Sequence, residues 1–128
     1  MENNPLNHAP SLLDVLRKIN EGVDDFSSNP AKTASDRGAF DDYPLHKVAI
    51  WGDIPSAAVL LANGADINAL GEDGDTPLHR AIAGRQIGMV RFLVSQGADI
   101  HIQNRYRSSP QDDASDSNDS DLTAALVP

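Results

Sequence analysis

Cysteine is missing from this sequence of 128 residues. Disulfide bonds, thiolate metal sites and a cysteine nucleophile are therefore excluded. Basic residues are scarce, because 10 Lys and Arg stand against 19 Asp and Glu, which gives a formal net charge of −9. This balance disfavours binding to nucleic-acid phosphates and favours fast association with a basic protein. The alternative is that the charge serves solubility alone.

Long apolar runs are missing as well. No run approaches the roughly 20 residues that a membrane-spanning helix needs. The N-terminal stretch MENNPLNHAP has no basic start followed by an apolar core, so it does not have the pattern of a signal peptide. We therefore expect a cytoplasmic protein with no membrane partner.

Motifs of catalysis and cofactor binding are also absent. The sequence has no Gly-x-Ser-x-Gly nucleophile elbow and no histidine pair at metal-ligand spacing. The acidic stretch 71–74 would repel a phosphate group. His46 and His79 invite a metal or general-base hypothesis, but each stands alone. We expect no enzyme activity, no cofactor and no metal.

What the chain does contain is an internal repeat. The tripeptide Pro-Leu-His occurs at 44–46 and again at 77–79, an offset of 33 residues (77 − 44). The tetrapeptide Gly-Ala-Asp-Ile occurs at 64–67 and again at 97–100 with the same offset (97 − 64). Self-similarity at a fixed period of about 20–50 residues marks a repeat architecture.

The period and the tetrad Thr-Pro-Leu-His at 76–79 resemble the ankyrin repeat. The resemblance is close over 71–101, good over 43–70 and degenerate after residue 104. It implies an all-α fold, an ankyrin-repeat solenoid of stacked helix-turn-helix units with projecting β-turns. The residues that carry the repeat motif are Pro44, Leu45, His46, Gly64, Thr76, Pro77, Leu78, His79 and Gly97.

The two ends of the chain depart from this pattern. Ser11 and Asp14 form a capping-box pattern before an apolar stripe, which predicts a helix that Gly22 ends. Gly22 starts a worn copy of the sequence at Gly64, at a spacing of 42 residues (64 − 22), nine more than the repeat. This helix is therefore interpreted as the second helix of a truncated repeat, followed by a nine-residue insertion.

The polar stretch 111–121 leaves two alternatives. A terminal repeat needs a polar outer face, which favours a cap, whereas poor helix formers would also fit disorder. We prefer the cap. The predicted divisions of the single domain 1–128 are a loose arm (1–10), an N-terminal capping helix (11–24), a long insertion loop (25–41), the first full repeat (42–70), the second full repeat (71–103) and a degenerate C-terminal capping repeat (104–128).

The resemblance also implies roles for the histidines. In ankyrin repeats this histidine binds backbone groups and a threonine, and so ties neighbouring turns together. We therefore expect structural roles for His46 and His79. Thr76 is present in the second repeat, but Tyr43 stands at the equivalent place in the first. We expect this replacement to loosen the network there.

Ankyrin proteins bind partners through the projecting turns and the exposed side of each first helix. Aromatic residues often anchor such contacts, and acidic neighbours suit a basic protein partner. Two alternatives remain: Trp51 packs under the insertion, and Asp73 and Asp75 serve turn geometry only. The partner-binding residues that the resemblance implies are Phe40, Asp42, Ile50, Trp51, Glu72, Asp73, Asp75, Arg105, Tyr106 and Asp116.

Two roles follow for such a binding module. One is a dedicated inhibitor or adaptor of a single basic protein, for which the bacterial immunity proteins that neutralise a cognate toxin are an analogy. The other is an adaptor or regulatory subunit of a larger complex. In either role we expect the free protein to be a monomer.

Overall fold

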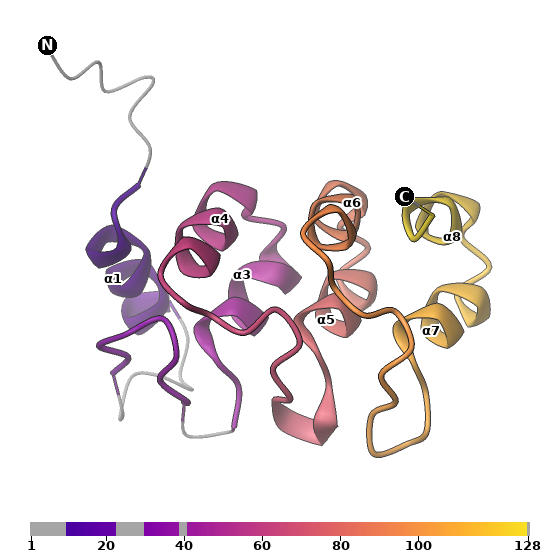
Figure 1. The fold of residues 1–128 in the computed structure, drawn as a ribbon, viewed down its shortest axis with the longest axis horizontal. Helices are drawn as coiled ribbons and strands as arrows, with labels where there is room; N and C mark the ends of the chain where they lie inside the picture. The colour runs from indigo at the N-terminus through magenta and orange to yellow at the C-terminus, as the bar shows by residue number, and fades with distance from the viewer. Residues whose placement is uncertain (1–9, 23–29, 39–40, 128) are drawn as a thin grey trace, which may run out of the picture.

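The computed structural model describes residues 10–22, 30–38 and 41–127. In this part of the chain there are seven α-helices, one short 3-10 turn and no strand (Figure 1). The all-α prediction is therefore confirmed. The elements are α1 (Leu12–Gly22), α3 (Pro44–Trp51), α4 (Ile54–Ala62), η1 (Glu72–Gly74), α5 (Pro77–Ala83), α6 (Ile87–Ser95), α7 (Pro110–Asp116) and α8 (Ser120–Ala125).

The helices stack in two rows. The inner helices α3, α5 and α7 lie side by side, and α1, α4, α6 and α8 form the outer row (Figure 1). Each inner helix has proline at its first position, where the missing N–H costs no hydrogen bond. The predicted stack of helix-turn-helix units is therefore present from α3 to α8, and α1 extends the outer row by one helix.

The core lies between the two rows. Leu45 and Leu78 are buried at equivalent positions of α3 and α5, and Leu60 and Leu93 at equivalent positions of α4 and α6. In the last repeat, Gln111 takes the place of the inner leucine and is exposed, so the end of the stack is polar. The stretch 111–121, for which the sequence left a cap or disorder open, lies largely in α7 and α8.

Three segments precede the inner helices at equivalent positions, and we number them turn 1 (38–42, of which 39 and 40 lie outside the described residues), turn 2 (71–75) and turn 3 (104–108). Turns 2 and 3 hang below the helices in Figure 1. In each turn the first N–H donates to the carbonyl oxygen four residues later, at 2.7, 2.8 and 3.0 Å respectively. In each, the fourth N–H also donates back to the first carbonyl. The period of 33 therefore holds for backbone hydrogen bonds as well as for sequence.

The predicted insertion loop 25–41 stays a prediction, and its described residues 30–38 form turns and irregular backbone with no helix or strand. The Thr33 Oγ1 accepts from the N–H two residues later at 3.2 Å, as the Asp66 and Asp99 carboxylates do at 2.9 and 2.8 Å. Residues 31–42 thus follow the same frame as 64–75. The extra residues of the first unit therefore precede this frame rather than interrupt it.

The match is not apparent from sequence similarity, because Ala-Lys-Thr-Ala at 31–34 stands where later repeats have Gly-Ala-Asp-Ile. A threonine hydroxyl can replace the aspartate carboxylate in this local turn. Asn20 of α1 then fixes the start of the segment, since its side chain accepts from the Ala31 N–H at 2.8 Å and donates to the Ala31 carbonyl at 3.0 Å.

Candidate protein-binding surface

Asp42 was expected on the exposed face, and the structure contradicts this, because the residue is only 1% exposed. Its carboxylate accepts hydrogen bonds from the Glu72 N–H at 2.9 Å and from Arg80 at 2.9 and 3.1 Å. The Lys47 ammonium lies 3.2 Å away. Burial alone would raise the pKa of Asp42, but the hydrogen bond from the Glu72 N–H and the positive charges of Arg80 and Lys47 outweigh it and lower the pKa below 3.8. Asp42 is thus an internal anion that joins turn 1 to turn 2.

Two further acids of the predicted surface also hold the turns together. The Asp75 carboxylate accepts from Arg80 Nε at 3.2 Å and from Asn104 Nδ2 at 2.9 Å. Asp73 pairs with Arg105 of turn 3 at 3.2 Å. Both aspartates are only partly exposed. The negative field expected around the turns is therefore largely neutralised by these internal ion pairs.

His46 and His79 are buried and tie each repeat to the next. His46 Nε2–H donates to the carbonyl oxygen of Asp75 at 2.8 Å, and His79 Nε2–H donates to that of Ser108 at 2.8 Å. Backbone N–H groups donate to both Nδ1 atoms, so Nε2 must carry the proton. Burial lowers the pKa of His46 more than the charge of Asp42 raises it, which keeps this imidazole neutral.

The tyrosine of the first repeat changes one link of this network. In the second repeat the Thr76 hydroxyl accepts from the His79 N–H at 3.3 Å. In the first repeat the His46 N–H donates to the Tyr43 carbonyl at 3.0 Å instead, and the Tyr43 N–H still donates to the His46 ring. The backbone links remain, whereas the hydroxyl link is lost.

The C-terminal ends of the inner helices form a row along one edge of the stack. Ile50, Ala83 and Asp116 stand at equivalent positions, 33 residues apart, on α3, α5 and α7. Trp51 follows Ile50, and both side chains are 36% exposed. Gly84 allows close packing here, since a Cβ on it would lie 2.6 Å from the Ile50 carbonyl oxygen. We call Ile50, Trp51, Ala83 and Asp116 the inner-helix row.

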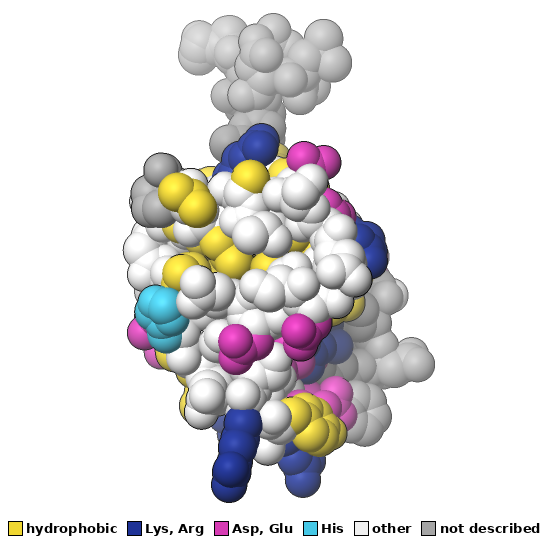
Figure 2. All heavy atoms as spheres, turned by 90° about the vertical axis from the view of Figure 1, so that its right-hand side faces the viewer, with side chains coloured by type: hydrophobic (Ala, Val, Ile, Leu, Met, Phe, Trp, Pro, Cys, Tyr) yellow, Lys and Arg dark blue, Asp and Glu magenta, His cyan; other side chains and the backbone are white. Residues whose placement is uncertain are grey.

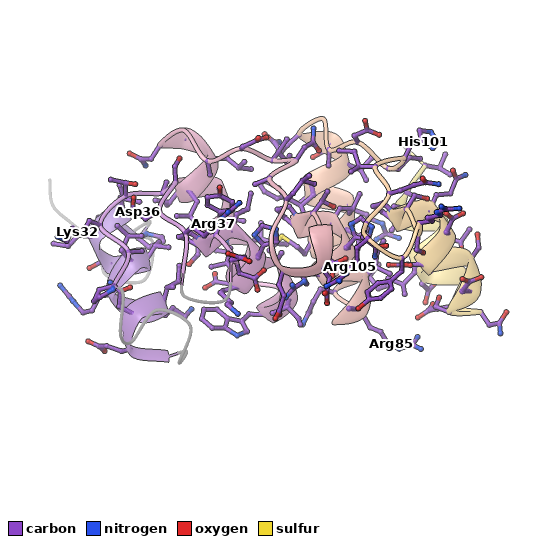
Figure 3. All side chains as sticks on the ribbon, turned by 90° about the horizontal axis from the view of Figure 1, so that it is seen from below. Lys32, Asp36, Arg37, Arg85, His101 and Arg105 are labelled. Carbon is purple, nitrogen blue, oxygen red and sulfur yellow. The ribbon has the colours of Figure 1, made fainter. Side chains whose placement is uncertain are left out.

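The row is hollowed between α5 and α7. The hollow has a volume of about 320 Å³. The Arg85 side chain reaches this edge, on the side away from His101 (Figure 3), and pairs with Asp119 at 3.0 Å. Two of the three aspartates of α7, Asp113 and Asp116, line the hollow, and α7 has no basic residue. The row therefore changes from apolar at α3 to acidic at α7. The residues that line the hollow are Ile82, Ala83, Arg85, Asp113, Asp116 and Ser117.

Turn 3 presents a second exposed group of a different kind. Tyr106 is 69% exposed, and the Arg105 guanidinium lies 5.7 Å from the centre of its ring. Figure 2 shows the C-terminal end of the stack, with acidic side chains near the middle and Lys and Arg side chains at the bottom, where the turns project. Arg107 also belongs to this tip and is exposed. Sequence reasoning missed Arg107, although the offset of 33 from Gly74 places it at the same point of its turn.

The remaining predicted residues divide clearly. Phe40 lies outside the described residues. Glu72, Arg105, Tyr106 and Asp116 are exposed, as are Ile50 and Trp51. The motif residues Pro44, Leu45, His46, Thr76, Pro77, Leu78 and His79 are buried, and Gly64 and Gly97 take φ values of +94° and +95°.

The described residues lack the features of a membrane-spanning or metal-binding protein. Among them, no helix has the length and apolar character to cross a membrane. No group of three or more His, Asp or Glu side chains in that part of the chain is arranged to hold a metal ion.

Comparison with known proteins identifies the repeat. A family model described as ankyrin repeats in many copies matches residues 45–94, which run from α3 into α6. Residues 45–94 carry ankyrin repeats. No curated protein matches the sequence. Ankyrin repeats indicate a protein–protein interaction module, and the family is generally non-catalytic.

Proposed function

We propose that this ankyrin-repeat protein binds a basic protein through the inner-helix row and thereby inhibits or neutralises it. The observation that carries the proposal is one continuous edge on which exposed Ile50 and Trp51 adjoin the acidic hollow at Asp113 and Asp116. The charge of −9 supports a partner of the opposite sign, because complementary charges speed association.

The chemistry of the row suits two kinds of partner side chain. Trp51 offers a large apolar surface, and exposed tryptophans are frequent binding hot spots. The hollow offers two carboxylates beside the apolar wall of Ile82 and Ala83, and the charge of its one basic residue, Arg85, is paired with Asp119. A lysine or arginine can place its aliphatic stem on such a wall and its charge at the carboxylates. The helices that carry these residues are packed in a stack, so little ordering is needed on binding.

A second candidate is an adaptor or regulatory subunit of a larger complex. The observation that favours it is the separate group at turn 3, where Arg105 and Tyr106 give an exposed basic and aromatic tip. Two exposed groups of opposite charge suit two different partners. A toxin as the partner is one form of the inhibitor role.

An affinity capture from the native lysate at low and moderate salt tests the proposal. The baits are the wild type, Trp51→Ala and Asp116→Lys, with Leu13→Ala on α1 as an exposed control. We expect one basic protein that both row variants lose and the control retains. A partner retained by both row variants but lost on Tyr106→Ala would favour the adaptor role.

If one partner is captured, an assay of its own activity distinguishes binding alone from inhibition. The activity is assayed with increasing amounts of wild-type protein and of Trp51→Ala. Inhibition by the wild type alone supports an inhibitor. Full activity at saturating wild type would leave binding without inhibition and contradict that part of the proposal.

A further inference from the structure

Turn 3 reverses the charge of turn 2. At equivalent positions, turn 2 reads Gly-Glu-Asp-Gly-Asp and turn 3 reads Asn-Arg-Tyr-Arg-Ser. The three acidic residues of turn 2 are thus absent from turn 3, which has two arginines instead, in a chain whose net charge is −9. Departures from a repeat pattern are expected at functional sites, because elsewhere the pattern serves folding. We call Arg105, Tyr106 and Arg107 the turn 3 tip.

The last residue of the turn 3 tip has a strained backbone. Arg107 has a φ of +63°, where the equivalent Gly74 of turn 2 has a φ of +73°. Glycine adopts this left-handed conformation without strain, and among other residues only asparagine and aspartate adopt it routinely. Folding alone would therefore favour glycine at position 107. Strained residues cluster at functional sites, so the arginine points to a role outside the fold.

The backbone of turn 3 is fixed by its own first residue. The Asn104 Oδ1 atom accepts hydrogen bonds from the Tyr106 N–H at 2.9 Å and from the Ser108 N–H at 3.1 Å. The Arg105 N–H donates to the carbonyl oxygen of Asp73 in turn 2 at 2.9 Å. The turn 3 tip is thus held before any partner arrives, which lowers the ordering cost of binding.

Arg107 carries the available positive charge of the turn 3 tip. Its exposed guanidinium forms no hydrogen bond or ion pair with any of the described residues. The Arg105 guanidinium, by contrast, is paired with Asp73 at 3.2 Å. Tyr106 is 69% exposed and adds an aromatic surface next to both arginines. The tip therefore offers one unpaired guanidinium beside an exposed ring.

A carboxylate fits this tip better than a phosphate group. A guanidinium can donate two parallel hydrogen bonds to one carboxylate. A phosphate group brings nearly two negative charges, whereas only one positive charge is unpaired here. Turn 2, which is hydrogen-bonded to turn 3, also carries the exposed Glu72, whose charge repels a doubly charged group more strongly than a singly charged one.

We propose that turn 3 is a binding site for an acidic segment of a partner protein, and that Arg107 binds an aspartate or glutamate carboxylate there beside Tyr106. The proposal rests on the second candidate function, because it names the chemistry of the partner at turn 3, and it does not depend on the inner-helix row. Figure 2 shows the acidic side chains near the middle of this end and the Lys and Arg side chains at the bottom. The two surfaces thus select partners of opposite charge.

The test begins with a peptide selection. A library of short random peptides is selected on the immobilised full chain, as wild type and as Arg107→Gly. We expect peptides rich in Asp and Glu from the wild type and no such enrichment from Arg107→Gly. One acid-rich peptide is then measured by calorimetry, and Arg107→Gly should weaken its binding about tenfold or more, because hydrogen bonds between charged groups are lost.

Two further variants separate binding from folding. Arg107→Ala removes the same guanidinium and should weaken the peptide to the same extent. Arg107→Gly should do so while raising the melting temperature, which a role in the fold alone would not produce. Arg91→Ala, at an exposed basic position of α6, is the matched control and should bind the peptide as the wild type does.

The possible failures are distinguishable. Acid-rich peptides selected equally by wild type and Arg107→Gly, or no enrichment of acids by either, would overturn the proposal. A peptide that Tyr106→Ala loses and Arg107→Gly retains would overturn the role of Arg107 but leave the second candidate function in place. Tighter binding after replacement of a glutamate in the peptide by phosphoserine would assign the tip to phosphate and contradict the proposal. Peptides lost only in Trp51→Ala would belong to the inner-helix row and count against turn 3.

Discussion

The guanidinium group of Arg80 holds the carboxylate of Asp42 through two hydrogen bonds of 2.9 and 3.1 Å, although the residues are 38 positions apart. This pair links the second repeat to turn 1. Since Arg80 also binds Asp75, which accepts from Asn104, one polar chain connects all three turns. The turns are thus held in register by buried charge as well as by the histidines.

Asp42→Asn should therefore lower the free energy of unfolding by about 3 kcal/mol, because removing one partner of a buried ion pair leaves the others uncompensated. Urea unfolding followed by circular dichroism measures the change. Asp41→Asn, one residue earlier and exposed, is the matched control and should change stability by less than about 0.5 kcal/mol. Equal effects of the two substitutions would show that the Asp42 network does not stabilise the fold.

The buried His46 predicts a loss of stability at mildly acidic pH. Its pKa is lowered from 6.5 because burial disfavours the imidazolium form. As the pH falls below 6.5, the unfolded chain takes up the proton first, so the free energy of unfolding decreases. Above 6.5 this contribution is fully present.

Unfolding at pH 7.5 and pH 5.5 checks this prediction. The carboxylates with a lowered pKa are Asp36, Asp42, Asp53 and Asp112, and since their ordinary pKa is 3.8 they change the stability only at more acidic pH. His46→Gln, which cannot be protonated, should lose less stability between the two pH values than the wild type. An identical loss in both proteins would contradict the assignment.

Arg107 takes a left-handed conformation, with φ of +63°, at the point of turn 3 where turn 2 has Gly74. A residue other than glycine costs about 1–2 kcal/mol in this conformation, and glycine avoids that cost. Glycine also loses more conformational freedom on folding, which offsets part of the gain in stability. We expect Arg107→Gly to raise the free energy of unfolding by about 0.5–1 kcal/mol. Arg107→Ala removes the same charge but keeps the strain, and should give no such gain. A gain of equal size in both would assign the effect to charge.

Leu78 is 1% exposed and lies in the middle of the core of the second repeat. Leu78→Ala should destabilise the fold by about 2–5 kcal/mol through loss of contacts and a residual cavity. Leu13→Ala, on an exposed position of α1, should cost less than about 0.5 kcal/mol. A loss for Leu78→Ala within the range of that control would refute the packing described for α5.

The sequence predicted the fold because its signals are local. Pro44 and Pro77 start helices α3 and α5, and Gly64 and Gly97 follow helices α4 and α6. Each of these residues affects only the backbone next to it. The first connection, 31–42, was missed because its geometry depends mainly on backbone hydrogen bonds. Many different residues allow the same backbone hydrogen bonds, and here the hydroxyl of Thr33 takes the place of the aspartate carboxylate.

The candidate surface was less predictable than the fold. The offset of 33 placed Ile50 and Asp116 on one edge, because equivalent positions of stacked repeats lie side by side. It could not show that Asp42 is buried, since that depends on Arg80 in the next repeat.

The most direct measurement of the proposed binding function is the affinity of the captured partner for the wild type and for Trp51→Ala. Calorimetry at two salt concentrations separates the contribution of Trp51 to the binding free energy, which does not depend on salt, from that of the acidic hollow, which does. The account predicts that Trp51→Ala weakens binding by about 2 kcal/mol at both salt concentrations with an unchanged melting temperature, and that salt weakens the wild-type complex. Unchanged affinity in Trp51→Ala, or a melting temperature that collapses with it, would contradict a binding role for the inner-helix row.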